Sequence, residues 1–183
     1  SLSSSNVPSE GAIRRVVLSL GSNLGRRELN VLRSAGAVAV LPGVSRARLS
    51  SLYESEPVGA GFGRPFVNAV MMLETRLEPR ALHAACRRLE DACGPRGDAV
   101  RMDRQLDIDI VIFGDLRCRL PGLILPHPRF RQRLFVLEPL AELAPDLALP
   151  PDDEPAVEAA RRLAGGCWVR RISSRRLAGV NLL

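Results

Sequence analysis

The chain has 183 residues, of which 46% are apolar and 25% are charged, with 26 basic and 20 acidic side chains. This length excludes two large domains, and the composition is that of an ordinary globular protein that folds without disulfides or a structural metal. Every basic residue is arginine, and the net charge of +6 favours an anionic partner over a cationic one.

The cysteines and the apolar runs indicate where such a protein works. Cys86, Cys93, Cys118 and Cys167 form no CxxC pair and have no histidine at a spacing typical of zinc sites. We therefore expect reduced thiols and a cytoplasmic protein. No apolar run reaches the length of a membrane span. Serine-rich residues 1–12 predict a disordered leader, or residues added for expression.

In the first half of the chain, strand-like and helix-like patterns alternate. The turn Gly21-Ser22-Asn23 is interpreted as the N-cap of the first helix, and Pro42-Gly43 as its end. Glycines and prolines predict a loop over residues 56–65. The predicted elements, in order, are a strand at 16–20, a helix at 24–41, strands at 44–53 and 66–75, and a helix from Pro79 to Gly94.

The second half begins with a polar, arginine-rich loop over residues 94–104. The remaining predicted elements are a strand at 105–113, a helix at 131–143, a helix at 155–163 and a strand-like run at 168–172. The order βαββαβ, with additions at the C-terminus, predicts an α+β fold. We expect a ferredoxin-like sandwich that has an antiparallel sheet and its helices on one face.

Two aspartates at the start of the strand over residues 105–113 are the strongest chemical signal in the sequence. Side chains alternate along a strand, so Asp107 and Asp109 share one face while Ile108 and Ile110 occupy the other. Carboxylates about 7 Å apart beside apolar residues repel each other and lose solvation. A hard cation such as Mg²⁺ would relieve both effects. An edge strand whose carboxylates pair with arginines explains the pair alone equally well.

Arginines concentrate around these aspartates. Residues 96–133 contain eight arginines and five acids. Carboxylates, Mg²⁺ and guanidinium groups together can bind a polyphosphate and stabilise phosphoryl transfer. A solvated basic face would explain some of these arginines without any function.

Three more residues suggest binding. His127 lies between two prolines, which favour an extended segment that presents the imidazole. His83, by contrast, lies within a predicted helix and is interpreted as structural. Phe66 and Asn68 are two apart on one strand and share a face, where an aromatic ring beside an amide suits a flat heterocycle. A core position for Phe66 is the default alternative.

Taken together, these segments resemble the 6-hydroxymethyl-7,8-dihydropterin pyrophosphokinase family. The resemblance covers about residues 16–150, and its motifs occur in the family's order. They are LGSNL at 20–24, YESEPVG at 53–59, FVNA at 66–69, ET at 74–75, LE at 89–90, RQLDIDI at 104–110, PHPR at 126–129 and FVLEPL at 135–140.

The resemblance implies a ferredoxin-like enzyme that transfers diphosphate from ATP to the pterin hydroxymethyl group and releases AMP, with two Mg²⁺ ions held by Asp107 and Asp109. The implied catalytic residues are Asp107, Asp109, Arg104, Arg96 and Arg101. The implied ATP-binding residues are Arg104, His127, Arg133, Glu90 and Arg87. The implied pterin-binding residues are Asn23, Ser55, Glu56, Val58, Phe66, Asn68 and Phe135, with Ser22 beside them.

One loop departs from the family pattern. Arg101-Met102-Asp103 stand where the family has a Gly-Pro pair before the arginine at Arg104, and only Pro95-Arg96 remain of a basic pair after Gly94. The loops over residues 56–65 and 94–103 are expected to close over both substrates. We therefore predict an active enzyme with altered loop kinetics.

The predicted organisation is a pyrophosphokinase domain over residues 13–150 and an extension over 151–183 packed on it. The run at 168–172 would cover the sheet edge or mediate self-association. We expect ATP and the pterin as small-molecule partners, no nucleic acid and no membrane, and a monomer, with a dimer as the alternative.

Two other functions stay open at this point. A nucleic-acid-binding module is favoured by the arginine content, but the chain has only seven aromatic residues, and paired acids repel phosphate. A metal-dependent phosphohydrolase would use the same aspartates.

Overall fold

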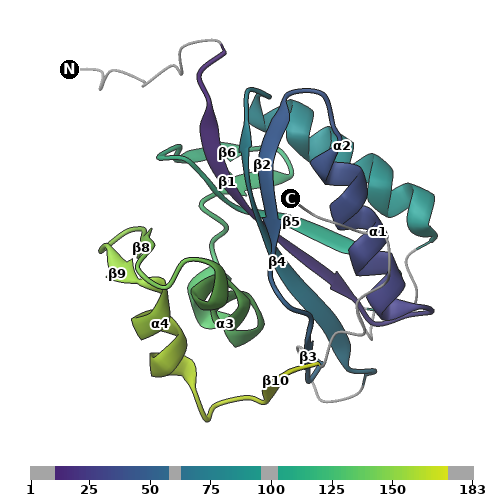
Figure 1. The fold of residues 1–183 in the computed structure, drawn as a ribbon, viewed down its shortest axis with the longest axis vertical. Coiled ribbons are helices and arrows are strands. Elements are labelled where there is room, and N and C mark those ends of the chain that lie inside the picture. Colours follow the sequence, from purple (N-terminus) through teal and green to yellow (C-terminus); the bar gives the residue numbers. More distant parts are fainter. Residues whose placement is uncertain (1–10, 58–62, 96–102, 173–183) are drawn as a thin grey trace.

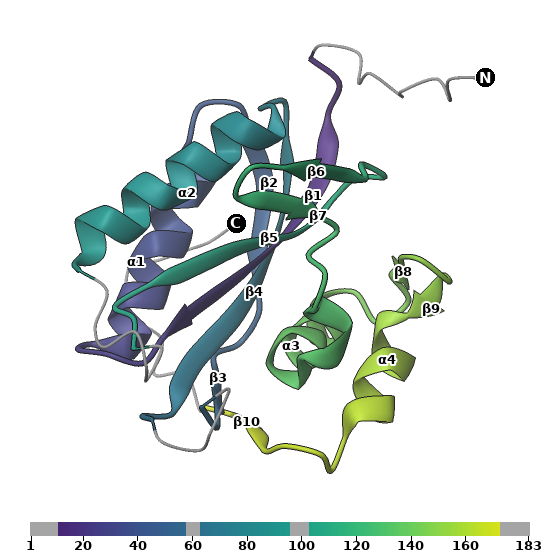
Figure 2. The same cartoon turned by 180° about the vertical axis from the view of Figure 1, so that it is seen from behind.

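The computed structural model describes residues 11–57, 63–95 and 103–172. Figures 1 and 2 show an antiparallel sheet with helices on both faces. The helices are α1 (Arg27–Ala39), α2 (Pro79–Cys93), α3 (Leu134–Leu143) and α4 (Ala156–Leu163), with a 3-10 turn η1 (Phe130–Gln132). The strands are β1 (Arg14–Ser22), β2 (Val44–Leu49), β3 (Tyr53–Ser55), β4 (Phe66–Thr75), β5 (Asp107–Phe113), β6 (Cys118–Leu120), β7 (Leu123–Leu125), β8 (Ala148–Leu149), β9 (Glu154–Pro155) and β10 (Val169–Arg171).

The main sheet is built around β1 and β4, the two longest strands. Its order is β10-β3-β4-β1-β5, and β2 pairs with another part of β4. All these pairs are antiparallel. The pairs β6–β7 and β8–β9 form separate two-stranded sheets. The fold is therefore a mixed α/β fold with an antiparallel sheet, as the sequence predicts.

Side-chain alternation along β1 divides the interior into two apolar layers. Val16, Leu18 and Leu20 pack in the layer that α1 and α2 cover, whereas Val17 packs in the layer that α3 and α4 cover. A strand buried on both faces is apolar at successive positions, which explains the continuous apolar run at residues 16–20. The expectation of helices on one face holds for α1 and α2, and the later helices cover the opposite face.

Two predicted boundaries are wrong. Helix α1 begins at Arg27, because β1 continues through Ser22 and the next two N–H groups donate to the carbonyl oxygen of Arg104, at 3.1 and 3.2 Å. The expected cap at residues 21–23 therefore does not form. The strand expected over 44–53 is two strands, since the Ser50 side chain accepts the Val70 N–H at 3.0 Å and replaces a main-chain partner. The pairs β6–β7 and β8–β9 have no counterpart among the predicted elements.

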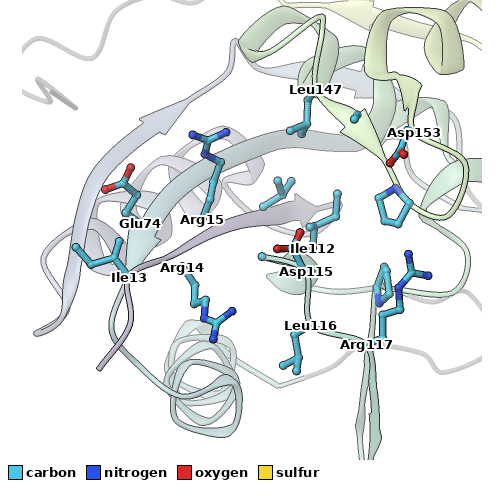
Figure 3. Close-up of a pocket in the computed structure, with 15 residues that line it drawn as sticks. Ile13, Arg14, Arg15, Glu74, Ile112, Asp115, Leu116, Arg117, Leu147 and Asp153 are labelled. Atoms are coloured by element: carbon cyan, nitrogen blue, oxygen red, sulfur yellow. The ribbon is translucent and has the colours of Figure 1, made fainter. Parts of the chain in front are cut away.

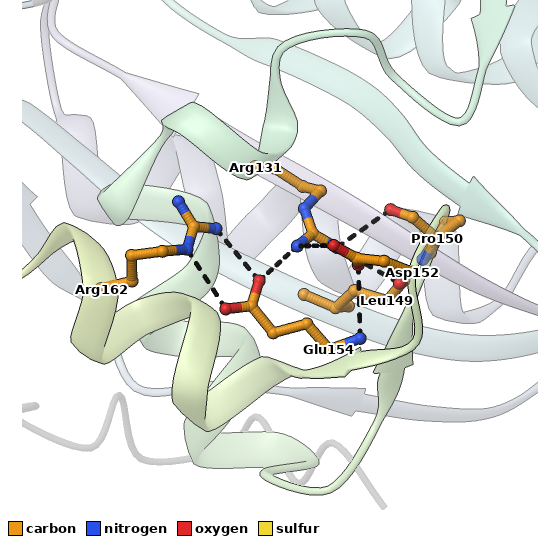
Figure 4. A network of polar contacts seen from close by, with 6 residues as sticks. All are labelled: Arg131, Leu149, Pro150, Asp152, Glu154 and Arg162. Carbon is orange, nitrogen blue, oxygen red and sulfur yellow. Dashed lines mark hydrogen bonds and ion pairs between the residues drawn. The ribbon is translucent and has the colours of Figure 1, made fainter.

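The segment after residue 150 packs on α3 through apolar contacts and on η1 through charged contacts. Ala156, Ala159 and Ala160 of α4 are buried in the layer that contains α3. Arg131 donates to Asp152 at 2.7 Å, and Glu154 accepts from both Arg131 and Arg162 (Figure 4). Strand β10 pairs with β3, so the run at 168–172 lies along the sheet edge, which is one of the two roles that the sequence left open.

The structure describes the helices and the four cysteines that the sequence analysis considered. In the described part of the chain, no helix is both long enough and apolar enough to cross a membrane. All four cysteines are free, and Cys86 is buried, which raises the pKa of its thiol to about 12. A thiol with so high a pKa is unreactive at neutral pH.

Glu142, near the end of α3, makes stability depend on pH. Its carboxylate accepts hydrogen bonds from the Tyr53 hydroxyl at 2.6 Å and from the Ser51 N–H and Oγ at 3.1 and 2.9 Å. Burial opposes the charge, but these bonds and Arg171 lower the pKa of Glu142 below its usual 4.5. A lowered folded-state pKa stabilises the protein above the unfolded pKa, and this contribution disappears as pH falls through the folded value.

We therefore expect the free energy of unfolding to decrease as pH falls below about 4.5, and Glu142→Gln to reduce that dependence. Denaturant titrations from about pH 3 to about pH 7 measure both slopes. Glu158→Gln, which removes an exposed carboxylate from α4, is the matched control and should keep the wild-type slope. Equal slopes in Glu142→Gln and wild type would refute this role of Glu142.

Candidate active site

Polar side chains replace apolar ones at one end of the sheet, on the face that α3 covers. Val17 of β1 is followed on that face by Ser19 and Gly21. In the strand register, Ser19 lies opposite Asp109, and Gly21 lies between Asp107 and Asn68. A side chain at Gly21 would crowd this row, because an added Cβ would lie 3.1 Å from the Asn68 Oδ1. The same side-chain alternation that places apolar residues in the core therefore also places these polar residues together on one face.

A cavity of about 100 Å³ lies above this row, and we call it the phenylalanine pocket. Helix α3 begins beside the pocket, so its N-terminal segment contributes to the wall. The lining residues are Ser19, Gly21, Ser55, Phe66, Asn68, Arg104, Asp107, Asp109, Arg129, Arg133 and Phe135. This set contains both predicted aspartates and both predicted aromatic residues.

A second cavity of about 260 Å³ lies on the other side of β5, between α2 and the β6–β7 pair, and we call it the histidine pocket. His83, Arg87, Asp109 and His127 line it together with apolar residues of β5, β7 and the adjoining turns. Asp109 is the one described residue that lines both pockets. The two pockets therefore meet at a carboxylate.

The like charges of Asp107 and Asp109 repel each other. Burial, followed by the negative charge of Asp109, raises the pKa of Asp107 to about 6, although Arg104 acts in the opposite direction. Arg104 Nη1 lies 2.9 Å from Asp107, and Arg133 Nη1 lies 3.0 Å from Asp109. Strand β5 is also an edge strand of the main sheet, so the arginine-paired edge expected as the alternative is present here too. These ion pairs, however, line a cavity with two aromatic rings.

His127 faces the same carboxylate from the histidine pocket. Its Nε2 lies 3.6 Å from Asp109 Oδ2, and its Nδ1 accepts the Arg129 N–H at 3.2 Å. Burial, with Arg133 and Arg129, lowers the pKa of His127 below its usual value despite Asp109. The lowered pKa favours the neutral imidazole. Because Nδ1 accepts a hydrogen bond, we assign the proton of the neutral ring to Nε2, the nitrogen that faces Asp109.

The aromatic side of the phenylalanine pocket is held by short contacts. Asn68 is buried and donates from Nδ2 to the Ser55 hydroxyl at 2.9 Å, which links β4 to β3. Phe66 and Phe135 both line the pocket, and the Arg133 guanidinium lies 5.6 Å from the Phe135 ring centre. The pocket thus offers two ring faces and an amide, which suits a flat polar heterocycle.

Other predicted site residues line neither pocket. Several of them bond to the residues and segments that do. Asn23 accepts the Arg104 N–H at 2.7 Å and donates to Asp103 at 2.8 Å. Buried Glu90 accepts the Ile108 N–H at 2.7 Å and pairs with Arg87 at 2.6 Å. Ser22 is buried, and its hydroxyl donates to the carbonyl oxygen of Leu24. Glu56 accepts a main-chain N–H from the C-terminal segment, and Val58, Arg96 and Arg101 fall outside the described residues.

Sequence reasoning missed several lining residues. His83 was interpreted as structural, but it lines the histidine pocket and lies beside Arg87, whose Nε is 3.4 Å from its Nε2. Ser19 and Gly21 line the phenylalanine pocket because they face Asp109 and Asp107 across the β1–β5 pair. The alternation along β1 could have identified Ser19 and Gly21, but no local signal distinguishes His83.

The carboxylate pair fits a divalent cation. Asp107 and Asp109 both border the phenylalanine pocket, and the raised pKa of Asp107 shows that the charged pair is costly without compensation. Across the described residues, no three histidine, cysteine or acidic side chains converge on one point. Two carboxylates completed by water and phosphate oxygens are typical of Mg²⁺ rather than of zinc.

A larger cleft of about 500 Å³ lies at the far end of β1 and contains none of the predicted site residues. Arg14, Arg15 and Arg117 line it together with Glu74, Asp115 and Asp153. Figure 3 shows these charged side chains spread around the cleft rather than converging on one position. Its volume alone therefore does not make it the candidate active site.

A family model that matches most of the chain identifies its family. Residues 17–145 match the model of the 7,8-dihydro-6-hydroxymethylpterin-pyrophosphokinase (HPPK) family. The chain belongs to the HPPK family. Both pockets are built almost entirely from residues within this match.

Relatives of this HPPK-family chain span bacteria and plants. A 2-amino-4-hydroxy-6-hydroxymethyldihydropteridine pyrophosphokinase from Pseudomonas aeruginosa is 41% identical over 138 residues, which cover 75% of this chain and 85% of the relative. The protein of the same name from Bacillus subtilis is 34% identical over 126 residues, covering 69% and 75%. A mitochondrial folate synthesis bifunctional protein from Arabidopsis thaliana is 36% identical over 144 residues, covering 78% of this chain and 26% of the relative.

Solved structures share the fold at low identity. A crystal structure of Plasmodium falciparum HPPK-DHPS superposes with a TM-score of 0.61 at 13% identity, covering 84% of this chain and 46% of that chain. A structure of HPPK-DHPS in complex with substrates gives a TM-score of 0.62 at 11% identity, covering 81% and 43%. This HPPK-family chain thus spans less than half of each of these two solved chains.

Proposed function

We propose that this HPPK-family chain is an ATP-dependent diphosphotransferase that acts on 6-hydroxymethyl-7,8-dihydropterin and releases AMP. The observation that carries the proposal is that Asp109 borders both pockets, one with aromatic walls and one with histidine and arginine walls. A reaction between a heterocycle and a polyphosphate needs two such subsites that meet at a charge-stabilising centre. The names of the bacterial relatives support the same reaction.

The pterin is proposed to bind in the phenylalanine pocket. Phe66 and Phe135 would hold the ring, and Asn68 and Ser55 would bond its polar edge. Glu56 and Val58 would contribute from the same segment of the chain, and Asn23 and Ser22 would support this side of the site. The aromatic and amide groups match the chemistry of a pterin, which has flat faces and a polar rim.

ATP is proposed to bind with its phosphates between the histidine pocket and the carboxylates. Arg104, Arg133 and His127 lie beside Asp107 and Asp109 and would bind phosphate oxygens. Arg87, held by Glu90, would contribute from α2, and Arg96 and Arg101 from the loop before Arg104. Asp107 and Asp109 would hold the two proposed Mg²⁺ ions, which would neutralise phosphate charge during transfer.

In this mechanism the chain contributes binding, orientation and electrostatic stabilisation. The ring contacts direct the pterin hydroxymethyl oxygen toward the β-phosphorus of ATP for in-line attack. The bond between the pterin oxygen and the β-phosphorus forms as the bond between the β-phosphorus and the α,β-bridging oxygen breaks. AMP leaves with that oxygen, and the hydroxymethyl proton passes to water. The guanidinium groups of Arg104 and Arg133 stabilise the spreading negative charge. The lowered pKa of His127 favours the neutral ring, which would donate a hydrogen bond from Nε2 to a phosphate oxygen without adding positive charge.

The finer features of the fold belong to the same proposal. The order β5-β1-β4-β3 around α1 and α2 supports a ferredoxin-like core. We propose a catalytic domain over residues 13–150 with the C-terminal extension packed on it, working as a cytoplasmic monomer with small-molecule partners and no nucleic acid.

Nucleotide analysis tests the function directly. The chain is incubated with ATP, Mg²⁺ and 6-hydroxymethyl-7,8-dihydropterin, and each component is omitted in turn. AMP and the pterin diphosphate should form only in the complete mixture. ADP, or ATP cleavage without the pterin, would instead indicate a phosphohydrolase and overturn the proposal.

A further inference from the structure

We propose that residues 164–172, which lie beyond the family match at residues 17–145, position the pterin side of the site. We call this segment the C-terminal strap. The inference rests on the proposed function, because it assigns the strap a role in pterin binding. The strap leaves α4 and ends in β10, which lies against β3 at the sheet edge.

The strap is paired with the strand that contributes Ser55 to the phenylalanine pocket. In the β10–β3 register, Val169 lies opposite Ser55 and Arg170 opposite Glu54. The Trp168 N–H donates to Glu56 Oε1 at 3.0 Å, just beyond the end of β3. On the other side, the Ile172 N–H donates to the carbonyl oxygen of Leu52 at 2.8 Å. The strap therefore binds the three-residue strand β3 along its whole length.

Two ion pairs and a hydrogen bond extend this contact to Pro65, the residue before Phe66. Arg170 donates from Nε and Nη2 to Glu54 Oε2, at 3.1 and 2.5 Å. The same carboxylate binds Arg27 of α1 at 3.1 Å, and Arg27 Nη1 donates to the carbonyl oxygen of Pro65 at 2.6 Å. The two arginines lower the pKa of Glu54, so the link is charged at neutral pH. Glu56 and Pro65 lie at the two ends of the β3–β4 connection. Glu56 is thus bonded to the strap, and Pro65 is linked to Glu54 through Arg27.

Because of this geometry, we expect the strap to affect binding of the pterin but not binding of ATP. Ser55 is held by the Asn68 amide on one side and by the β10 pairing on the other, while Phe66 directly follows Pro65. A three-residue edge strand without an outer partner has greater freedom to move, so losing the strap spreads Ser55 and Phe66 over more positions. The histidine pocket lies on the other side of β5 and contacts none of these residues.

The test compares Arg170→Ala with Arg161→Ala. Both remove one exposed arginine from the C-terminal part of the chain. Among the described residues, Arg161 pairs with Glu158 of its own helix α4, whereas Arg170 pairs with Glu54 on β3. Dissociation constants for the pterin and for ATP are measured by calorimetry on the whole chain, alongside KM values and melting temperatures. We expect Arg170→Ala to weaken pterin binding about three- to fivefold, the range of a single exposed ion pair, with the ATP constant unchanged.

Two further variants separate positioning from simple stability. Arg170→Lys keeps the charge and should recover most of the pterin affinity, and Arg170→Pro, which removes a strand N–H donor, should weaken it beyond Arg170→Ala. A pterin constant for Arg170→Ala equal to that of Arg161→Ala would overturn the inference, as would equal losses for both substrates. A wild-type chain that neither binds the pterin nor forms AMP would instead overturn the proposed function.

Discussion

Replacing Asp109 by alanine is expected to reduce AMP formation to well below about one-tenth of the wild-type rate. Asp109 borders both pockets, pairs with Arg133 at 3.0 Å and faces His127 at 3.6 Å. Its loss would remove one of two carboxylates proposed to hold Mg²⁺ and would leave Arg133 without its partner. Both effects weaken stabilisation of the transferred diphosphate, whereas ring binding in the phenylalanine pocket should persist.

The same substitution should leave the protein folded. The charge of Asp109 contributes to the raised pKa of Asp107, so its removal relieves repulsion while it costs one ion pair. We expect the melting temperature to change by less than about 4 °C. Asp115→Ala, at an exposed carboxylate just beyond β5, is the matched control and should retain wild-type activity. A folded Asp109→Ala chain that keeps more than about a tenth of the rate would contradict the assigned role.

Replacing Asn68 by alanine is expected to lower kcat/KM for the pterin about 30- to 150-fold, with KM for ATP unchanged. Asn68 is 2% exposed and its amide joins Ser55 to the pocket wall, with Nδ2 2.9 Å from Oγ. Its loss would leave polar atoms of the pterin and of Ser55 unpaired in a confined site, which costs about 2–3 kcal/mol. Steady-state rates with each substrate varied in turn measure the two constants separately.

Asn30→Ala is the matched control for this prediction. The Asn30 amide donates to the carbonyl oxygens of Leu24 and Gln105, at 3.2 and 3.0 Å, and lines neither pocket. Its removal should lower the melting temperature without changing the ratio of the two KM values. If Asn68→Ala lowered the melting temperature but left the pterin constants intact, Asn68 would be a structural residue only.

Local pattern predicted the parts of the site that share one strand. Alternation placed Asp107 and Asp109 together on β5, and Phe66 and Asn68 together on β4, and all four line the phenylalanine pocket. Alternation is a property of the extended backbone, so it needs no knowledge of the fold. The strand at 66–75 and the helix from Pro79 were confirmed with the boundaries expected, because proline and glycine mark these ends within the sequence itself.

The predictions that failed involved competition between local and distant partners. A cap for α1 was expected at residues 21–23, but those residues extend β1 and bond to the segment before β5 instead. His83 was interpreted as structural, and its position in the wall of the histidine pocket, beside the β6–β7 pair and His127, was not predicted. The residues next to these positions in the sequence predict neither the longer β1 nor the pocket wall that includes His83.

The sequence by itself determined the family, the order of the main elements and the pairing of chemical groups along each strand, because these depend on spacing over a few residues. Only the tertiary structure decided that α3 and α4 cover the second face, that Asp109 borders two pockets, and that residues 164–172 close the edge beside Ser55. Contacts between residues as far apart as Glu54 and Arg170 depend on how the sheet is assembled, since pairing and packing free energies are realised only when both partners are folded.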